Sequence, residues 1–320
     1  MNIAKEGRTT MKISIQTGNV IDCIGYEKGY ALFREAGFDA IDWNLDHSAK
    51  AKELMSGSCR GKCVFEKPLE DILAYYKEEL DAIHANGLEI TQAHAPFPPY
   101  AANDPELTGY VASITRNMIG FCDKVGCGNL VVHGINPVFD DNDITLDDVR
   151  EMNIRFYASL IPVLLKSNVT VCLENLPVGR NRGMDKLEGI CCDPQDAAEL
   201  IDTLNEMAGR EVFGLCLDTG HLNLIRRDPR RYVAVLGRRI KATHLHDNNG
   251  FTDEHIVPFS GTMNWKHLCQ ALHEAGYSGD LSFETFLQTE HVLRFDEDLL
   301  LPWLKLIHAC GEAFAKTVSP

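Results

Sequence analysis

The stretch Ile240–His255, IKATHLHDNNGFTDEH, combines a strand-like segment with a cluster of polar side chains. It opens with an apolar run typical of a short strand, which ends on His246. Asp253 and His255 follow after the turn-forming sequence Asn248-Asn249-Gly250. Imidazole and carboxylate groups are both ligands for divalent cations. A polar loop whose histidines are only hydrated would have the same sequence. The rest of the chain has to distinguish such a loop from a metal site.

Similar apolar runs recur along the chain and alternate with amphipathic segments. They are rich in Val, Ile, Leu and Phe without strict polar alternation, which is typical of parallel strands covered on both faces. The expected strands are Met11–Ile15, Phe38–Trp43, Leu88–His94, Asn129–His133, Val169–Glu174, Val212–Leu217, Ile240–His246 and Asp280–Glu284.

Helical patterns occupy the segments between these runs. Apolar residues from Leu69 to Ile83 follow one face of a helix that ends at Asn86-Gly87. Asp193-Pro194 and Asp228-Pro229 each combine an N-cap with a proline in the first turn. In the helix expected between Asp147 and Ser167, Pro162 predicts a kink or a late start.

This alternation predicts an α/β protein, a single (β/α)₈ TIM barrel domain over residues 1–320 with residues 1–10 as an N-terminal tail. A doubly wound open sheet is the alternative, but no GxGxxG turn follows the first strand. The segments Asp46–Pro68 and Pro177–Ile190 are expected to be long loops over one face of the barrel.

The composition indicates where in the cell the protein is located and which classes of partner are unfavourable. The net charge of −15 disfavours nucleic acid as a partner. The first ten residues are polar and no apolar run approaches the roughly 18 residues of a membrane helix, so we expect no membrane contact. Eleven cysteines without a short-range framework fit a reducing cytoplasm. The pairs Cys59/Cys63 and Cys191/Cys192 could each bind a metal ion or form a disulfide bond.

Ionisable side chains stand at the ends of six consecutive expected strands. In a parallel barrel these ends meet at one face, so the side chains should converge. Crowded carboxylates repel one another unless a cation neutralises them, which predicts a divalent metal site. In chain order the residues are His94, His133, Glu174, Asp218 with His221, His246 with Asp253 and His255, and Glu284.

Four motifs in this order resemble the xylose isomerase-like TIM barrels, a family that includes sugar epimerases, sugar isomerases and endonuclease IV. They are LEN at Glu174, DTGH at Asp218–His221, HLHDN around His246 and SFET at Glu284. In the epimerase branch, the resemblance implies that Glu174, Asp218, His246 and Glu284 hold one Mn²⁺, Mg²⁺ or Co²⁺ ion.

The same resemblance implies that Glu174 and Glu284 are the catalytic acid/base pair. Proton transfer next to a carbonyl forms an enediolate that a metal stabilises, and two carboxylates remove and return the proton. We therefore expect an isomerase or epimerase acting on a small carbohydrate, either a sugar or a sugar phosphate. A lyase or dehydratase acting on a keto-sugar or polyol would use the same site. The sequence leaves open whether the protein forms a homo-oligomer.

The endonuclease IV branch gives the main alternative, a zinc phosphodiesterase acting on abasic DNA. Its pattern assigns His94, His133 and Glu174 to one zinc ion, with Glu174 bridging to the four-ligand site. His221, Asp253 and His255 match a third zinc site. The basic loops with which that branch grips DNA have no evident counterpart in this chain. The one basic cluster, between Arg226 and Arg239, fits a solvated helix face.

A non-catalytic sugar-binding barrel is the third hypothesis. The sugar epimerases carry a Glu and an Arg after the seventh-strand histidine, where this chain has DNNGFTDEH, which leaves the substrate open. Trp43, Phe97 and Trp265 could pack against a sugar ring, and Lys241 and Lys266 could contact a phosphate.

Overall fold

The computed structural model describes residues 11–46, 49–97, 105–136, 144–179 and 186–319. Its main strands are β1 (Ile13–Gln16), β2 (Ala40–Asn44), β3 (Glu89–His94), β4 (Asn129–Val131), β5 (Thr170–Glu174), β8 (Phe213–Asp218), β9 (Ile240–His244) and β10 (Leu281–Phe283). All neighbours pair in parallel, in the order β10-β1-β2-β3-β4-β5-β8-β9. The amide of Leu245 donates to Ser282 O at 2.8 Å, and that of Glu284 donates to Leu245 O at 3.1 Å, which closes the sheet.

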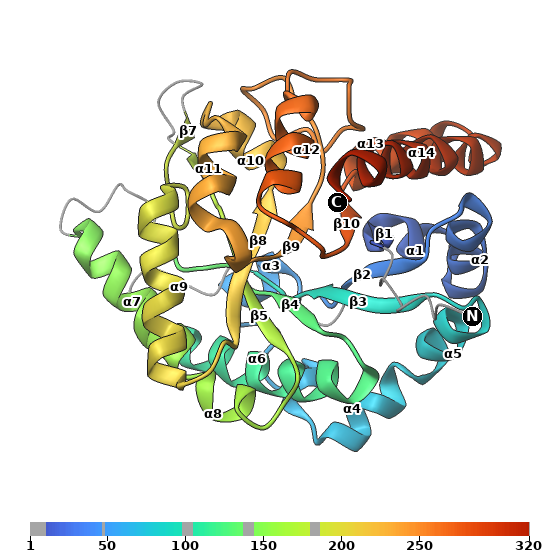
Figure 1. The fold of residues 1–320 in the computed structure, drawn as a ribbon. Helices are drawn as coiled ribbons and strands as arrows, with labels where there is room; N and C mark the ends of the chain where they lie inside the picture. The colour runs from blue at the N-terminus through green and yellow to red at the C-terminus, as the bar shows by residue number, and fades with distance from the viewer. Residues whose placement is uncertain (1–10, 47–48, 98–104, 137–143, 180–185, 320) are drawn as a thin grey trace, which may run out of the picture.

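Helices surround this closed sheet (Figure 1). The expected (β/α)₈ TIM barrel is therefore confirmed. The helices are α1 (Gly18–Ile24), α2 (Tyr26–Ala36), α3 (Ala51–Met55), α4 (Leu69–Tyr75), α5 (Lys77–Ala85), α6 (Pro105–Val125), α7 (Leu146–Ala158), α8 (Ile161–Leu164), α9 (Pro194–Ala208), α10 (Thr219–Leu224), α11 (Pro229–Leu236), α12 (Trp265–Glu274), α13 (Phe286–Phe295) and α14 (Leu300–Val318). Short 3₁₀ helices are η1 (Val64–Glu66), η2 (Gly237–Arg239) and η3 (Glu297–Leu299).

Most of the expected strands are shorter in the structure. His94, Glu174 and Asp218 are the last residues of β3, β5 and β8. His133 and His246 instead lie two residues beyond the ends of β4 and β9. An apolar run continues past the point where the neighbouring strand stops pairing, so the sequence placed these ends too late.

Two helices expected to be continuous are divided. The apolar face from Leu69 to Ile83 is split between α4 and α5 at Tyr76, whose φ of −88° and ψ of 6° interrupt the helix. Pro162 lies in the first turn of a separate helix, α8, because proline lacks the amide that an interior position requires. The N-caps Asp193 and Asp228 are confirmed, since both side chains accept backbone amides.

The end of the chain packs against its beginning. In Figure 1 the red α14 lies beside β10 and α2, and it also contacts β1. A Cβ on Gly311 of α14 would lie 2.6 Å from Ile13 Cγ2 and 2.9 Å from Phe283 Cε2, so this close approach requires glycine. The C-terminal helix thus covers the barrel where β10 and β1 pair.

Some expectations fall partly outside the described residues. The expected tail, residues 1–10, is one of them, as is part of the loop Pro177–Ile190. The described part of that loop holds an unexpected antiparallel pair, β6 (Val178–Gly179) and β7 (Lys186–Leu187). All eleven cysteines are free, so Cys59/Cys63 and Cys191/Cys192 form no disulfide. None of the described helices has the length and apolarity needed to cross a membrane.

Candidate active site

Residues at and beyond the C-terminal ends of the strands line a cavity of about 270 Å³. It lies at the C-terminal face of the barrel, where TIM barrel enzymes have their active sites. Seven of the predicted site residues line it: His94, His133, Glu174, His221, Asp253, His255 and Glu284. The other two, Asp218 and His246, are fully buried next to these residues. The fold thus brings together all nine predicted side chains.

The carboxylate of Glu174 is the central group of this site. Its Oε2 lies 2.9 Å from His133 Nε2 and 3.6 Å from His94 Nε2. Its Oε1 lies 3.3 Å from His221 Nδ1. Burial alone raises the pKa of the Glu174 carboxyl, but the surrounding imidazoles outweigh burial and hold that pKa well below its usual range. Glu174 is therefore an anion surrounded by histidines.

Asp218 has two structural roles as well as its predicted one. It is the N-cap of α10, where its Oδ1 accepts the amide of His221 at 2.6 Å. The same carboxylate lies 3.0 Å from His246 Nε2 through Oδ2. Burial raises the pKa of Asp218, but the His221 and His246 imidazoles lower it below the usual value. The DTGH motif therefore fixes one carboxylate between two imidazoles.

A second group of side chains connects His221 with Asp253 and His255. Asp253 Oδ2 lies 3.4 Å from His221 Nε2 and 3.3 Å from His255 Nε2. His255 has a positive φ of 46°, and its Nδ1 lies 3.5 Å from Glu284 Oε2. Burial lowers the pKa of His255, but the carboxylates of Glu284 and Asp253 outweigh it and raise the pKa to about 9. This group connects the loop after β9 with the end of β10.

His244, which the sequence interpretation did not select, lies at the middle of the carboxylates. Its Nδ1 lies 3.4 Å from Glu174 Oε1, 3.6 Å from Glu284 Oε2 and 3.9 Å from Asp218 Oδ2. His246 follows His244 by two residues, and the period of two in an extended chain puts such side chains on the same face. That alternation was the signal in the HLH motif which could have identified His244.

The donor set fits a divalent cation. Several groups of three ligand atoms lie within 4.8 Å of one another: Asp218, His244 and Glu284; Glu174, Asp218 and His221; His94, Glu174 and His244; and His246, His255 and Glu284. Nδ1 of the buried His246 makes no hydrogen bond within the described part of the chain. Nitrogen and oxygen donors in this arrangement suit Mn²⁺, Co²⁺ or Zn²⁺.

Two phenylalanines belong to the wall of the cavity. Phe97 is 42% exposed, and its ring lies 4.5 Å from that of His133. Phe286, which the sequence interpretation missed, lies 4.5 Å from the ring of His255. Trp43 and Trp265 are instead buried, with indole hydrogen bonds to Glu79 and Asp247. Of the three aromatic candidates, only Phe97 lines the cavity.

Asp247, next to His246, fixes the loop that carries Asp253 and His255. It is fully buried and accepts the amides of Phe259 at 3.2 Å and Met263 at 3.0 Å. Its backbone also pairs with Ile256 in an antiparallel bridge. The loop is thereby folded back over the end of β9.

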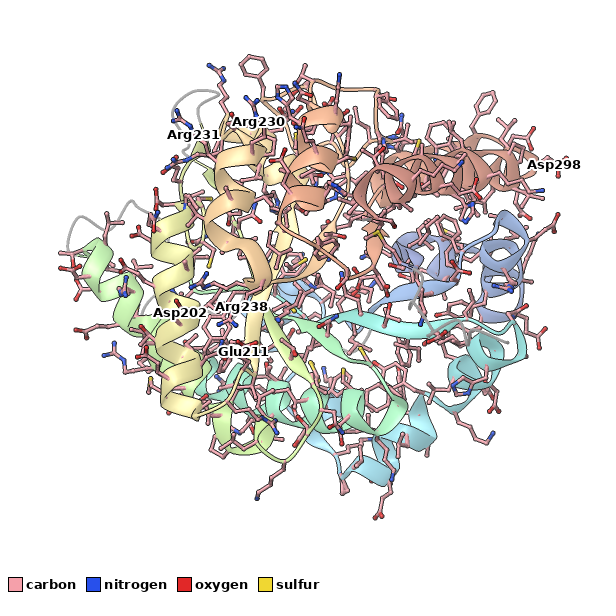
Figure 2. All side chains as sticks on the ribbon, viewed as in Figure 1. Asp202, Glu211, Arg230, Arg231, Arg238 and Asp298 are labelled. Carbon is pink, nitrogen blue, oxygen red and sulfur yellow. The ribbon has the colours of Figure 1, made fainter. Side chains whose placement is uncertain are left out.

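The basic cluster between Arg226 and Arg239 is divided between two places. Arg230 and Arg231 lie at one end of α11, whereas Arg238 lies beyond the other end near Glu211 (Figure 2). Four arginines of the cluster pair with acidic side chains: Arg227 with Glu188 and Asp193, Arg230 with Asp228, Arg238 with Glu211 and Arg239 with Asp202. Lys241 also pairs with Glu211. Acidic neighbours thus neutralise most of this cluster.

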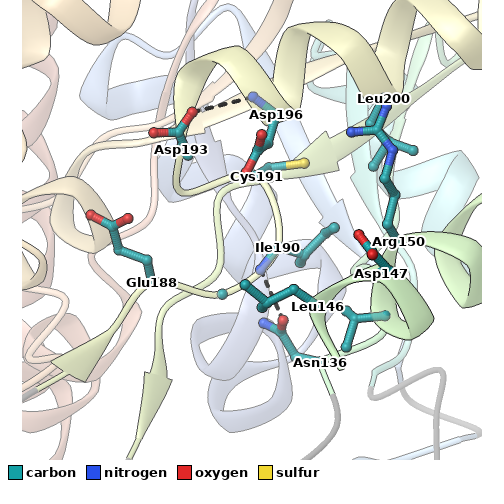
Figure 3. A pocket seen from close by; sticks show the side chains of 12 residues that line it. Asn136, Leu146, Asp147, Arg150, Glu188, Ile190, Cys191, Asp193, Asp196 and Leu200 are labelled. Atoms are coloured by element: carbon teal, nitrogen blue, oxygen red, sulfur yellow. Dashed lines mark hydrogen bonds between the residues drawn. The ribbon is translucent and has the colours of Figure 1, made fainter. Parts of the chain in front are cut away.

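A second cavity, of about 340 Å³, lies outside the predicted site between α7, α9 and the loop after β7. Figure 3 shows that Asn136 approaches Ile190 in its wall, where its Oδ1 accepts the Ile190 amide at 2.8 Å. The Asn136 amide nitrogen also donates to Leu176 O at 3.1 Å. These bonds connect Asn136 with Leu176 and Ile190, two described residues of the segment after β5, which gives this wall a structural role.

Comparisons with known proteins agree with this fold. The family model of the xylose isomerase-like TIM barrel matches residues 30–305. An uncharacterized protein of Sinorhizobium fredii, y4fM, is 27% identical over 282 residues, which are 82% of this chain and 81% of that protein.

Two solved structures share the fold. The D-psicose 3-epimerase from Clostridium cellulolyticum H10, solved with D-tagatose, has a TM-score of 0.68 at 16% identity and covers 97% of this chain and 100% of its own. The IOLI protein with a binding zinc atom has a TM-score of 0.66 at 16% identity and covers 96% and 98%. The family match extends from α2 into α14 and includes every predicted site residue, so this chain belongs to the xylose isomerase-like TIM barrel family.

Proposed function

We propose that the protein is a divalent-metal-dependent isomerase or epimerase of a small sugar. One observation carries this proposal: Glu174 and Glu284 both lie within 3.6 Å of the same nitrogen, His244 Nδ1, beside a cavity that both residues line. Two carboxylates at one cavity, next to a set of metal ligands, suit the removal and return of a proton. The epimerase and IOLI structures that share this fold are consistent with the proposal.

The metal would be held by Glu174, Asp218, Glu284 and an imidazole, from His246 as the motif implies or from His244. Manganese, magnesium, cobalt and zinc are all candidates. When bound, the ion would supply positive charge to stabilise an enediolate. Imidazoles compensate these buried carboxylates when no metal is bound. A divalent ion would replace protons on those imidazoles as the compensating charge.

The acid/base pair would consist of Glu174 and Glu284. Glu174 ends β5 and Glu284 follows β10, with β8 and β9 between these strands in the barrel. The two carboxylates therefore reach the cavity from different sides, as a proton transfer between two faces of a substrate carbon requires. Groups of this kind contribute about 10²- to 10⁴-fold to the rate.

The cavity favours an uncharged sugar over a sugar phosphate. Among the described residues, those that line it include no Lys or Arg. Phe97 and Phe286 supply apolar surface on which the C–H face of a sugar ring can pack. A lyase or dehydratase acting on a keto-sugar or polyol would use the same carboxylates, and the eleven free cysteines fit a cytoplasmic enzyme.

Solvent proton exchange tests the proposal. The protein, loaded with Mg²⁺ or Zn²⁺, is incubated with a panel of ketoses in D₂O, and loss of the C–H signal is followed by ¹H NMR. Exchange at a carbon next to the carbonyl is expected for the wild type. The variants Glu174→Gln and Glu284→Gln should each lose about 10²-fold or more. Glu79→Gln, which alters a buried carboxylate between α5 and β2, is the matched control and should keep full exchange.

A zinc phosphodiesterase acting on abasic DNA is the second candidate. The observation that favours it is the arrangement of His94, His133 and Glu174 in one group and of His221, Asp253 and His255 in another. Nicking of an abasic oligonucleotide by the zinc-loaded protein would support it. Absence of nicking at low salt, where DNA binds most tightly, would exclude it. The net charge of −15 favours the sugar enzyme.

A further inference from the structure

A buried carboxylate that lies outside the predicted site contacts the back of His244. Asp42 on β2 and His244 on β9 are both fully buried inside the barrel. Asp42 Oδ2 lies 3.0 Å from His244 Nε2. The same oxygen accepts from Gln92 Nε2 at 2.6 Å and lies 3.4 Å from Ser282 Oγ. Three further strands thus meet at one carboxylate oxygen, which holds it in place.

This contact decides which ring nitrogen of His244 carries a proton. An ionised carboxylate only accepts hydrogen bonds, so the Nε2 that faces Asp42 carries the hydrogen. In the neutral ring, Nδ1 then has a lone pair. That nitrogen faces Glu174 Oε1 at 3.4 Å, Glu284 Oε2 at 3.6 Å and Asp218 Oδ2 at 3.9 Å.

Without a metal, a second ring proton on Nδ1 lets His244 donate to Glu174 Oε1. With a metal, the positive charge of the ion replaces that proton. A divalent ion at this position would bind the Nδ1 lone pair and the carboxylate oxygens together. A histidine that binds a metal through one ring nitrogen commonly donates the N–H of its other ring nitrogen to a carboxylate, which fixes the ring orientation. His244 has this arrangement, with Nε2 facing Asp42 and Nδ1 facing the three carboxylates.

We propose that Asp42 is a positioning residue of the metal centre, which holds His244 in the Nε2-protonated form and so presents Nδ1 as a ligand beside Asp218 and Glu284. The inference rests on the proposed function, because it requires a divalent ion at this site. Asp42 lies on the far side of the His244 ring from the other carboxylates, so it acts through His244.

Metal affinity gives the first test. The dissociation constants for Mn²⁺ and Zn²⁺ are measured by chelator competition for the wild type, Asp42→Asn and Glu79→Gln. An asparagine amide can donate to Nε2, which would move the ring hydrogen to Nδ1 and remove the lone pair. Asp42→Asn should weaken binding about 10- to 100-fold. Glu79→Gln alters a carboxylate that is 1% exposed and accepts hydrogen bonds from Tyr30 and Trp43, and the metal affinity of this variant should be unchanged.

A second measurement needs no change at Asp42. Long-range ¹H–¹⁵N spectra of the wild type loaded with Zn²⁺ report the tautomer of each histidine, and the His244 signal is assigned by its absence in His244→Gln. A hydrogen on Nε2 with a metal-shifted Nδ1 is expected. A hydrogen on Nδ1, or on both nitrogens, would overturn the inference.

The outcomes separate the two proposals. A wild-type protein that binds no divalent ion contradicts the proposed function. A wild type that binds metal, together with a folded Asp42→Asn variant of equal affinity, contradicts only the role of Asp42. If Asp42→Asn does not fold, the tautomer of His244 in the wild type shows whether Asp42 has the proposed role.

Discussion

Nε2 of His246 lies 3.0 Å from Oδ2 of Asp218, which connects the segment after β9 with the end of β8. The ring reaches this position because residue 220, two residues after Asp218, is glycine. A Cβ there would lie 2.0 Å from His246 Cε1. Real Cβ atoms do not approach other atoms so closely, so His246 and Gly220 depend on each other. The glycine of the DTGH motif thus makes room for the histidine of the HLHDN motif.

Substitution of Gly220 by alanine should displace His246. The added methyl group overpacks a fully buried site, which should lower the free energy of unfolding by about 1–3 kcal/mol. Metal affinity and sugar turnover should fall as well, because the Asp218–His246 contact is lost. Urea unfolding and chelator competition measure both effects.

Gly120→Ala is the matched control for this change. Gly120 lies inside α6, and a Cβ there has no neighbour within 4 Å. Alanine in a helix interior should stabilise the protein by about 0.5–1 kcal/mol. A Gly220→Ala variant with the stability and metal affinity of the wild type would show that His246 is not held as described.

Asp247→Ala should loosen the loop that carries Asp253 and His255. The change leaves the amides of Phe259 and Met263 and the indole N–H of Trp265 without their buried acceptor. We expect a loss of about 2–4 kcal/mol in the free energy of unfolding. Urea unfolding measures it, and Asp298→Ala on the exposed η3 should have almost no effect. Equal stabilities of the two variants would contradict the anchoring role of Asp247.

Removal of a bound divalent ion should destabilise the protein. Glu174, Asp218 and Glu284 come together around His244 only in the folded chain, so the ion binds the native state and not the unfolded one. An ion present at 100 times its dissociation constant would stabilise the fold by about 2.7 kcal/mol. Thermal unfolding should therefore shift down by several degrees after chelation and recover when Mn²⁺ or Zn²⁺ is returned. An identical midpoint with and without bound metal would disagree with this expectation.

The metal-free protein should lose stability in alkaline solution through His255. Its pKa is raised to about 9, above the ordinary value of about 6.5. A group with a raised folded-state pKa stabilises the protein below its unfolded pKa. That contribution is therefore complete below about pH 6.5 and is lost as the pH rises through about 9. NMR titration of the His255 ring measures the pKa, and Asp253→Asn should lower it. A wild-type value near 6.5 would contradict the assignment.

The amino-acid sequence alone predicted the barrel and nine side chains that the fold brings together. The β/α alternation needs no tertiary information, because parallel strands covered on both faces are continuously apolar. The equivalence of strand ends in a parallel barrel then predicted that residues as distant as His94 and Glu284 would meet, and the structure brings them to one cavity. The N-caps Asp193 and Asp228 were predictable for a similar reason, since a cap depends only on local backbone geometry.

The contacts between individual groups in the site follow from the three-dimensional fold and not from any local sequence pattern. Whether His244 or His246 faces Glu174 and Glu284 depends on where β9 stops and how it is staggered against β8, and a register shift between Leu215 and Cys216 affects that stagger. In the sequence, Asp42 is a single polar residue within an apolar strand. The closed barrel places its Oδ2 3.0 Å from His244 Nε2, about 200 residues away in sequence. Contacts across a barrel depend on stagger, closure and side-chain packing together, which no local pattern of residues encodes.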